Sequence, residues 1–582
     1  MAEILGEATA VEPTSKSSAD PHLSVAGLEG CKAGSGRFWQ RYRLYFPLIS
    51  AMLVAGLLWM VGKENLAITL ASIVVLIIGF RSSVAALRLF LSGSHPLVAV
   101  SRAIIEEAIS TRLSILLLMV VFVTLPTLPL LLDPAERLAY RLQFFLNWSL
   151  SGASILLAVL SIALACVSIT DDVDSRRLHM TLSKPIRRWE YLLGKWFGIC
   201  LLNVILVLLI GGGVAAFTIV LSRLPAISAD DRLAVNEQVL TARSVSRPRH
   251  PRGEDFNQAI EAAIEEIRSN DPGTFAKDPA GARKRIFSQK IHAWHTVTAD
   301  VISSFVFEGL DTQKIDAPVV QLRLEPFADN SNIARADVRF VVWLNDRPFP
   351  MRDGEHEEYT MQTGMVHTID LPVEAIDENG QLKVTIANRN LVMAGEDFAT
   401  SIAFTPGEGL EVLYRTGGFA GNLLKGLLVM WAKLAMVSAV AVSLASWLGL
   451  PTAILASLMV YITALASSFF ADAINIYTGL DRPDATAIAM LRLRVTMLAQ
   501  RLVKWEWWEA IKTVGSYFAD GFLALVPSFS DYDAITQLAT GRAVPFSDVV
   551  SVILIFAVAY PAGLLLLGWV FLERRDVVGA TS

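Results

Sequence analysis

The sequence predicts a mainly α-helical polytopic membrane protein with about eight spans and an extracytoplasmic α+β insertion. Of the 582 residues, 53% are hydrophobic and only 18% are charged, whereas soluble domains carry about 25% charged residues. The hydrophobic residues gather in long runs, and a polar stretch over 223–420 separates these runs into two groups. The net charge of −5 is small for this length and argues against a nucleic-acid partner.

Eight apolar runs approach the length of about 20 residues that a helix needs to cross the hydrocarbon core. They are 45–62, 66–80, 113–132, 144–169, 196–222, 423–447, 450–471 and 547–571. Only "GKEN" separates the first two runs, so 45–80 is predicted to form a transmembrane hairpin. The preceding residues 1–44 are polar and rich in Ser, Ala and Gly, which predicts a disordered arm.

Lysine and arginine are abundant in alternate connections, and this distribution predicts the orientation of the chain. The connection 170–195 contains Arg176, Arg177, Lys184, Arg187, Arg188 and Lys195, whereas the connection 63–65 contains Lys63 alone. We therefore expect both termini, the tail 572–582 and the connection 170–195 to be cytoplasmic. The segments 223–420 and 472–546 are then extracytoplasmic.

The segment 472–546 does not fit this orientation easily, because it contains six basic residues between Arg482 and Lys512. Apolar and basic residues alternate there, and the segment also contains Trp505, Trp507 and Trp508. This composition favours an amphipathic helix in the lipid headgroup layer. A helix packed against the protein's own outer domain is an equally good interpretation.

The insertion over 223–420 changes its periodicity along the chain. Residues 228–300 are predicted to be helical, since "EDFNQAIEAAIEEIRSN" places Ala and Ile at helical spacing. In 318–415, turn signals such as "NDRP" and "DENG" separate short runs that are rich in Val, Ile, Thr and aromatic residues. These runs are "VVQLRLEP", "ADVRFVVWLN", "MVHTIDLP", "QLKVTIAN", "TSIAFT" and "LEVLYR", and they predict an antiparallel β-sandwich or jelly roll.

No residue pattern points to a metal, a cofactor or a catalytic group. His292 and His295 have no acidic residue at the adjoining spacing, so we interpret them as surface histidines. The acidic turn at 355–358 lacks the alternating Asp/Asn-Gly pattern of a calcium loop. The phosphate-binding pattern G-x-x-x-x-G-K-[ST] is also absent, so we expect no ATPase or other enzyme activity in this chain.

The connection 170–195 has an ordered arrangement of charges. If "DDVDSRRLHMTLSK" is helical, it begins with Asp171, Asp172 and Asp174 and ends with Lys184, which suits the helix macrodipole at both ends. Pro185 would end this helix, and "IRRWEYLLGKWFG" would begin the next span. A helix that lies along the inner membrane surface between two spans would move both spans together.

The same stretch resembles the cytoplasmic loop of type-2 ABC transporter permeases, particularly the branch that includes the nitrous-oxide-reductase maturation permease. The matching residues are Asp174, Arg177, Leu182, Lys184, Pro185, Arg188, Glu190, Gly194, Lys195 and Gly198. "VAVSRAIIEEAISTR" resembles the family's amphipathic elbow helix, which is expected at 97–112. The resemblance covers 97–222 and 421–577, with three spans in 113–222, two in 421–471 and the last at 547–571.

The resemblance implies a permease of the cell inner membrane that works as a homodimer or beside a sister permease. A separate cytoplasmic ABC ATPase would dock on the ten matching residues and drive export or mechanical movement of the outer domain. The alternative is a membrane-anchored sensor or scaffold whose extracytoplasmic domain binds a ligand without transport. The spans contain few ionisable residues, which counts against a secondary transporter.

Overall fold

The computed structural model describes residues 47–574 apart from 94, 176–185, 250–253, 271–278, 299–301, 311–314, 316–318, 330–336, 353–354, 391–399, 471–494, 497, 500–501, 504, 506 and 526. The predicted arm 1–44 and most of the predicted tail 572–582 therefore lie outside the described residues. Two compact units divide the chain, 1–78 and 79–582. In the first unit, a helix over Pro47–Met60 precedes a turn at Gly62 (φ 78°), and helix α2 (Glu64–Phe90) begins directly after the turn.

Five helical segments among the described residues are long and apolar enough to cross a membrane. They are α2, α5 (Leu138–Asp174), α7 (Arg188–Ser222), α12 (Phe419–Ala445) and the run Phe546–Arg574, which joins α18 (Phe546–Val552), η6 (Ile553–Ala559) and α19 (Tyr560–Arg574). These helices support a multi-pass membrane protein, as predicted. The total of eight spans stays a prediction.

The other predicted spans correspond to shorter or bent helices. Helix α3 (Pro96–Ser110) lies where the elbow was expected, and the helix that follows it, α4 (Arg112–Thr127), continues into η1 (Leu128–Leu131). The axis of α3 and the axis of the helical run Ile115–Leu131 differ by 71°. Helix α13 (Leu450–Leu465) is apolar but only 16 residues long.

Helices α5 and α7 are longer than a bilayer requires. At 1.5 Å per residue, their 37 and 35 residues reach about 50–55 Å, whereas the hydrocarbon core is about 30 Å thick. Both helices are therefore long enough to extend beyond the hydrocarbon core.

Helix α12 packs against α5, α7, α13 and α19. Many of its buried side chains are small, including Ala432, Ala435, Ala439 and Ala441. On the facing helix α7, a Cβ atom added at Gly211 would collide with Leu427 of α12. Small residues at the interface thus allow the helices to approach closely, which is a common solution in membranes.

The polar insertion contains antiparallel β-sheets, as predicted. One sheet has the order β1 (Thr241–Ser246), β14 (Leu410–Gly418), β4 (Val319–Leu324) and β11 (His367–Pro372). A second has the order β10 (Tyr359–Gln362), β6 (Asp337–Leu344), β12 (Leu382–Asn388) and β3 (Ile302–Phe307), with β7 (Arg347–Phe349) paired to β6. Smaller sheets contain β2 (Thr296–Val297), β13 (Ser401–Phe404) and β5 (Pro326–Asp329), and β8 (Met351–Arg352) with β9 (Glu355–His356).

One hydrophobic core joins these sheets. Strand β6 alternates between exposed and buried residues in its first half, with Val338 and Phe340 inward, and they meet side chains from both large sheets, such as Leu322 and Val412. All six predicted strand segments are strands. The predicted "NDRP" turn is the β6–β7 hairpin, in which Asn345 and Asp346 both have positive φ. The jelly-roll topology stays a prediction.

The structure corrects two expectations for 228–300. The helices there are α8 (Ala229–Ala234), α9 (Glu254–Asn270) and α11 (Pro279–Trp294), but β1 interrupts them because its partner β14 lies far away in the sequence. His295 is not a surface residue: it is 1% exposed, and its ring lies 6.5 Å from that of Phe305 in the β core.

Candidate functional site

Helix α5, which contains the fourth predicted span, is longer than expected, and this changes the position of the aspartates. Asp171, Asp172 and Asp174 do not begin a new helix; they form the last turn of α5. Four of the matching residues, Arg177, Leu182, Lys184 and Pro185, lie outside the described residues. Since carboxylates are unfavourable at a helix C-terminus, cations must compensate them.

Lys195 provides such a cation from within the protein. It is 4% exposed, and its Nζ lies 2.9 Å from Asp172 Oδ2 and 3.5 Å from Glu107 Oε2 of α3. The same ammonium donates to Ser168 Oγ at 2.8 Å, and the Tyr191 hydroxyl donates to Asp172 Oδ2 at 2.8 Å. We call these five residues the Lys195 cluster. The cluster joins α3, α5 and α7, and its formal charge is −1.

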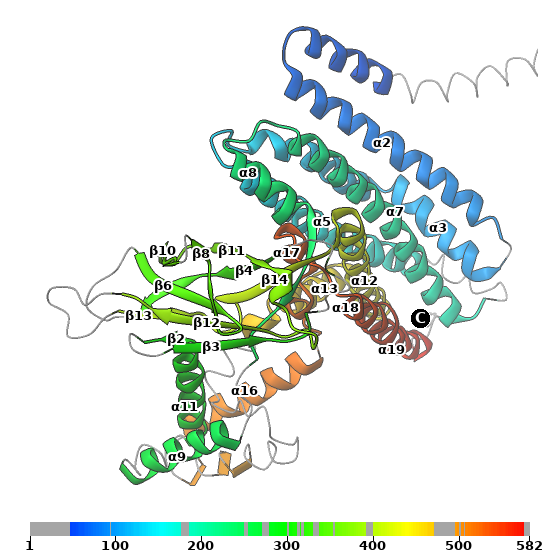
Figure 1. The fold of residues 1–582 in the computed structure, drawn as a ribbon. Helices are drawn as coiled ribbons and strands as arrows, with labels where there is room; N and C mark the ends of the chain where they lie inside the picture. Colours follow the sequence, from blue (N-terminus) through cyan, green and yellow to red (C-terminus); the bar gives the residue numbers. More distant parts are fainter. Residues whose placement is uncertain are drawn as a thin grey trace, which may run out of the picture. The chain divides into compact units, whose positions relative to one another are not determined.

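Two glycines bring α3 against α7 beside this cluster (Figure 1). A Cβ atom at Gly194 would lie 2.8 Å from Val100 Cβ. At Gly198 it would lie 2.8 Å from Ser101 O and would overlap Ile104. The Ser101 hydroxyl donates to Gly194 O at 3.0 Å, so the close approach also allows a hydrogen bond between the helices.

The first turn of α7 is fixed by two further matching residues. Glu190 Oε2 accepts the backbone N–H of Arg187 at 3.0 Å, as expected for a carboxylate at a helix N-terminus. Arg188 Nη1 donates to Leu572 O at 2.7 Å and to Glu573 O at 3.1 Å, at the C-terminal end of α19. This arginine therefore ties α7 to the last span.

The predicted residues thus separate into two groups. Gly194, Lys195 and Gly198 are buried and hold α3 on α7, whereas Asp174 is exposed at the end of α5. Direct contact with a partner would have to involve the exposed residues of the connection. Two of these exposed residues, Arg187 and Trp189, are not among the ten matching residues. The Trp189 side chain is 42% exposed.

The sequence pattern also missed the partners of Lys195. Glu107 lies in "IIEEAIS", where an acidic residue interrupts an apolar helix face, and this interruption was the available signal. Asp172 was recognised as acidic but was assigned to the wrong helix terminus.

A second polar cluster connects the β-sheets with the helices. Glu411 of β14 is fully buried, and its carboxylate lies 2.7 Å from Arg542 Nη2, 3.2 Å from Arg247 Nε and 3.4 Å from Arg323 Nη1. Arg243 donates to Gln321 Oε1 at 2.7 Å. Burial, together with the nearby positive charges of Arg542 and Arg323, lowers the pKa of Arg243 to about 10, so it stays protonated at neutral pH.

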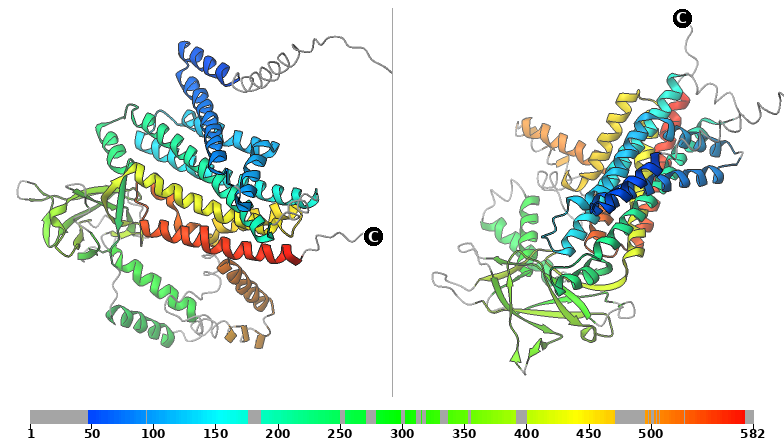
Figure 2. Two further views of the ribbon diagram at one scale, coloured as in Figure 1. Left: turned by 90° about the vertical axis from the view of Figure 1, so that its right-hand side faces the viewer. Right: turned by 90° about the horizontal axis from the view of Figure 1, so that it is seen from above.

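The segment 540–544 links the β-sheets to the helix bundle. Its backbone pairs with β1, since Arg243 N donates to Gly541 O at 2.9 Å and Ala543 N donates to Arg243 O at 2.8 Å. On its other side, the Asn422 side chain in the first turn of α12 bonds Arg542 O at 2.7 Å and Val544 N at 2.8 Å. Strand β14 also continues directly into α12 (Figure 2). We call 540–544 with Glu411, its three arginines and Arg243 the β–helix joint.

Residues 136–235 match a family model described as ABC-2 family transporter protein. The matched residues include α5 and α7, the two helices that contribute Asp172 and Lys195 to the cluster. No curated protein and no solved structure matches the chain. The match supports a type-2 ABC transporter permease and therefore a transmembrane subunit of an ABC transporter.

Proposed function

We propose that this chain is the permease subunit of a type-2 ABC transporter and that a separate cytoplasmic ABC ATPase drives it. The family match over 136–235 carries this proposal, because it falls on the helix pair α5 and α7 whose connection was predicted to dock the ATPase. The lack of a phosphate-binding loop in the sequence agrees with an ATPase on another chain.

The Lys195 cluster suggests how a push on the connection would spread. The ATPase would contact exposed residues near Asp174, Arg187 and Trp189. Because α3, α5 and α7 share a buried ion-pair cluster and closely packed glycines, the three helices would move together. Arg188 would pass part of this movement to α19.

The proposal includes the orientation expected from the Lys and Arg residues. Both termini and the connection 170–195 would be cytoplasmic, and 223–420 and 472–546 would be extracytoplasmic, in the cell inner membrane. The permease would work as a homodimer or beside a sister permease. It would belong to the branch that resembles the nitrous-oxide-reductase maturation permease, with a β-sandwich or jelly roll as its outer domain.

ATP hydrolysis would drive either export or movement of the outer domain. The β–helix joint favours movement of the outer domain. A buried carboxylate held by three arginines, next to paired backbone, is a stiff attachment between the β-sheets and α12. The alternative, a sensor or scaffold without transport, would need no ATPase subunit.

Co-purification of the full chain with an ABC ATPase subunit from the same organism tests the proposal. We expect a stable complex whose ATPase activity requires both subunits, and no ATP hydrolysis by this chain alone. Charge reversal in the connection, R177E with R187E, should abolish the complex. R347E on β7 is the matched control, since it reverses one exposed arginine far from the connection. If the double variant still binds the ATPase, the docking surface is elsewhere; ATP hydrolysis by this chain alone would refute the proposal.

Protease treatment of intact cells and inside-out vesicles tests the orientation. Cleavage within 223–420 is expected only when the protease acts from outside. Cleavage in that segment only from the inner side would overturn the proposed topology.

A further inference from the structure

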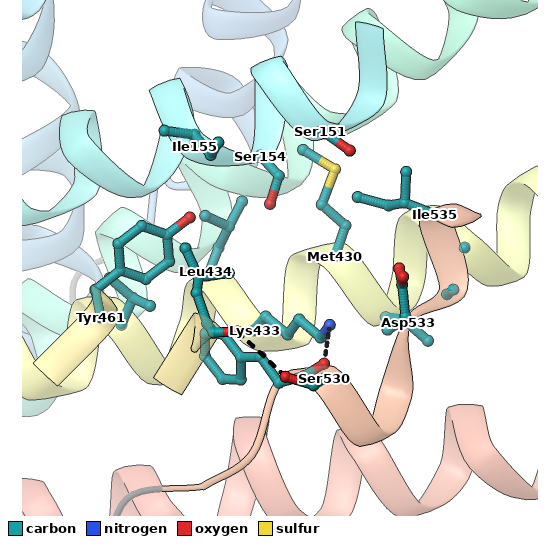
Figure 3. A pocket seen from close by; sticks show the side chains of 16 residues that line it. Ser151, Ser154, Ile155, Met430, Lys433, Leu434, Tyr461, Ser530, Asp533 and Ile535 are labelled. Atoms are coloured by element: carbon teal, nitrogen blue, oxygen red, sulfur yellow. Dashed lines mark hydrogen bonds between the residues drawn. The ribbon is translucent and has the colours of Figure 1, made fainter. Parts of the chain in front are cut away.

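A cavity of about 350 Å³ lies between α5, α12, α13 and the segment 529–535, which contains η5 (Ser530–Tyr532) and the start of α17 (Ala534–Ala539) (Figure 3). This volume is within the range of small-molecule sites, about 300–1,000 Å³. The cavity is separate from both the Lys195 cluster and the β–helix joint. Its lining therefore requires its own explanation.

Lys433 of α12 is the cation of this cavity. Its Nζ donates to two backbone carbonyls, Phe529 O and Tyr532 O, both at 2.9 Å. These acceptors are neutral, and no carboxylate of the described residues lies within ion-pair distance of Nζ. An ammonium has three N–H donors, so the bonds to Phe529 O and Tyr532 O leave one donor of Lys433 for another acceptor. An ionisable side chain inside a span is costly and usually has a functional role.

Tyr461 of α13 provides a second polar group at the wall of the cavity. The residue is only 6% exposed, and the Ser154 side chain is close enough to share a hydrogen bond with its hydroxyl. Figure 3 shows this hydroxyl directed towards Ser154 of α5 at the wall of the cavity. Each hydroxyl has one donor and two acceptor sites, so the Tyr461–Ser154 pair keeps one O–H donor for a ligand oxygen in the cavity.

The rest of the lining suits a hydrocarbon chain. It consists mainly of apolar side chains, including Ile155, Met430, Leu434, Leu465 and Phe529. The carboxylate of Asp533 also faces the cavity, where Oδ1 accepts the N–H of Thr536 at 3.2 Å and the negative charge attracts the Lys433 ammonium.

The cavity lies near the middle of α12. Lys433 lies about 21 Å along α12 from Phe419, at 1.5 Å per residue. The cavity is therefore within the helix bundle rather than at its end.

We infer that this cavity binds an amphiphile whose headgroup carries an anionic oxygen. The anionic oxygen would accept from Lys433 Nζ, a neighbouring headgroup oxygen would bond Tyr461, and an acyl chain would lie against the apolar wall. This binding does not require the ATPase of the proposed function, so the purified chain alone tests it.

The experiment measures lipid binding to the full chain in an uncharged detergent by native mass spectrometry. The two probes are phosphatidylglycerol and a diacylglycerol with the same acyl chains, which lacks the phosphate. We expect the phosphate-bearing lipid to bind about tenfold more tightly, because its anionic oxygen accepts a charge-assisted hydrogen bond that the diacylglycerol cannot accept. Inorganic phosphate at millimolar concentration should not displace it.

Three variants locate the effect. K433M should abolish the roughly tenfold preference, and K433R should retain it. K425M is the matched control, since Lys425 lies two turns away on the same helix and bonds Val544 O instead. In addition, S154W should fill the cavity and weaken binding of both lipids while Lys433 is intact. Thermal unfolding and gel filtration of each variant check the fold.

Several outcomes would overturn the inference. They are an equal affinity for the two lipids, an unchanged preference in K433M, and an equal loss in K425M and K433M. Displacement of the lipid by inorganic phosphate would show a simple anion site instead.

Discussion

Lys195 lies next to a basic connection, but its charge is paired with carboxylates inside the protein. A lysine near the end of a span ordinarily extends into water or headgroups, but this one is 4% exposed and faces two carboxylates. Removing one partner from a buried ion pair costs more than the pair itself contributes, because the remaining charges lose both water and their counterion. The cluster therefore depends on its single cation.

We predict that K195M destabilises the protein by about 3–5 kcal/mol, because Asp172 and Glu107 are left without a buried counterion. Thermal unfolding of the purified chain measures this effect. The triple variant K195M/D172N/E107Q, which removes all three charges, should recover most of the loss. If K195M alone is as stable as the wild type, the cluster does not hold these helices together.

At the scale of whole elements, the contact between α3 and α7 depends on the absence of side chains. Gly194 and Gly198 are one helical turn apart and lie under Val100 and Ser101 of α3. This contact explains why a glycine pair occurs in the first half of a long span, where glycine lowers helix stability by about 1 kcal/mol relative to alanine.

The variant G198A should separate α3 from α7 and cost about 1–3 kcal/mol through overpacking. Gly212 is the matched control in the same helix: a Cβ atom there would meet nothing within 4 Å, so G212A should be neutral or slightly stabilising. A cysteine pair across α3 and α7 would report their separation through the rate of disulfide crosslinking. Equal effects of the two substitutions on stability and crosslinking would contradict the role of Gly198.

Across the whole molecule, elements defined by local pattern were predictable and long-range pairs were not. Apolar runs located the long helices, and alternation located strands such as β6 and β12. Strand β1 was missed because "TARSVS" has little apolar alternation and becomes a strand only by pairing with β14. For the same reason, the resemblance found Lys195 but not its partner Glu107, which lies 88 residues earlier in the chain.

The β–helix joint is the long-range feature with the largest consequence, because it decides whether the β-sheets move with the spans. Glu411 pairs with three arginines: Arg323 of β4, Arg247 directly after β1, and Arg542 of the segment 540–544. E411Q would leave these arginines to repel one another, with an expected cost of about 3–5 kcal/mol. The exposed Glu374 provides the matched control, and E374Q should change stability by less than about 0.5 kcal/mol.

Hydrogen–deuterium exchange shows where the E411Q effect occurs. If the joint is a discrete attachment, exchange should rise together in β1 and in 540–544, whose backbones pair with each other. Exchange in β6 and β12 should stay unchanged, because their side chains belong to the hydrophobic core of the sheets. A rise of equal size in β6 and β12 would mean that Glu411 stabilises the β-sheets in general. In that case, movement of the helices would not pass to the β-sheets through this contact.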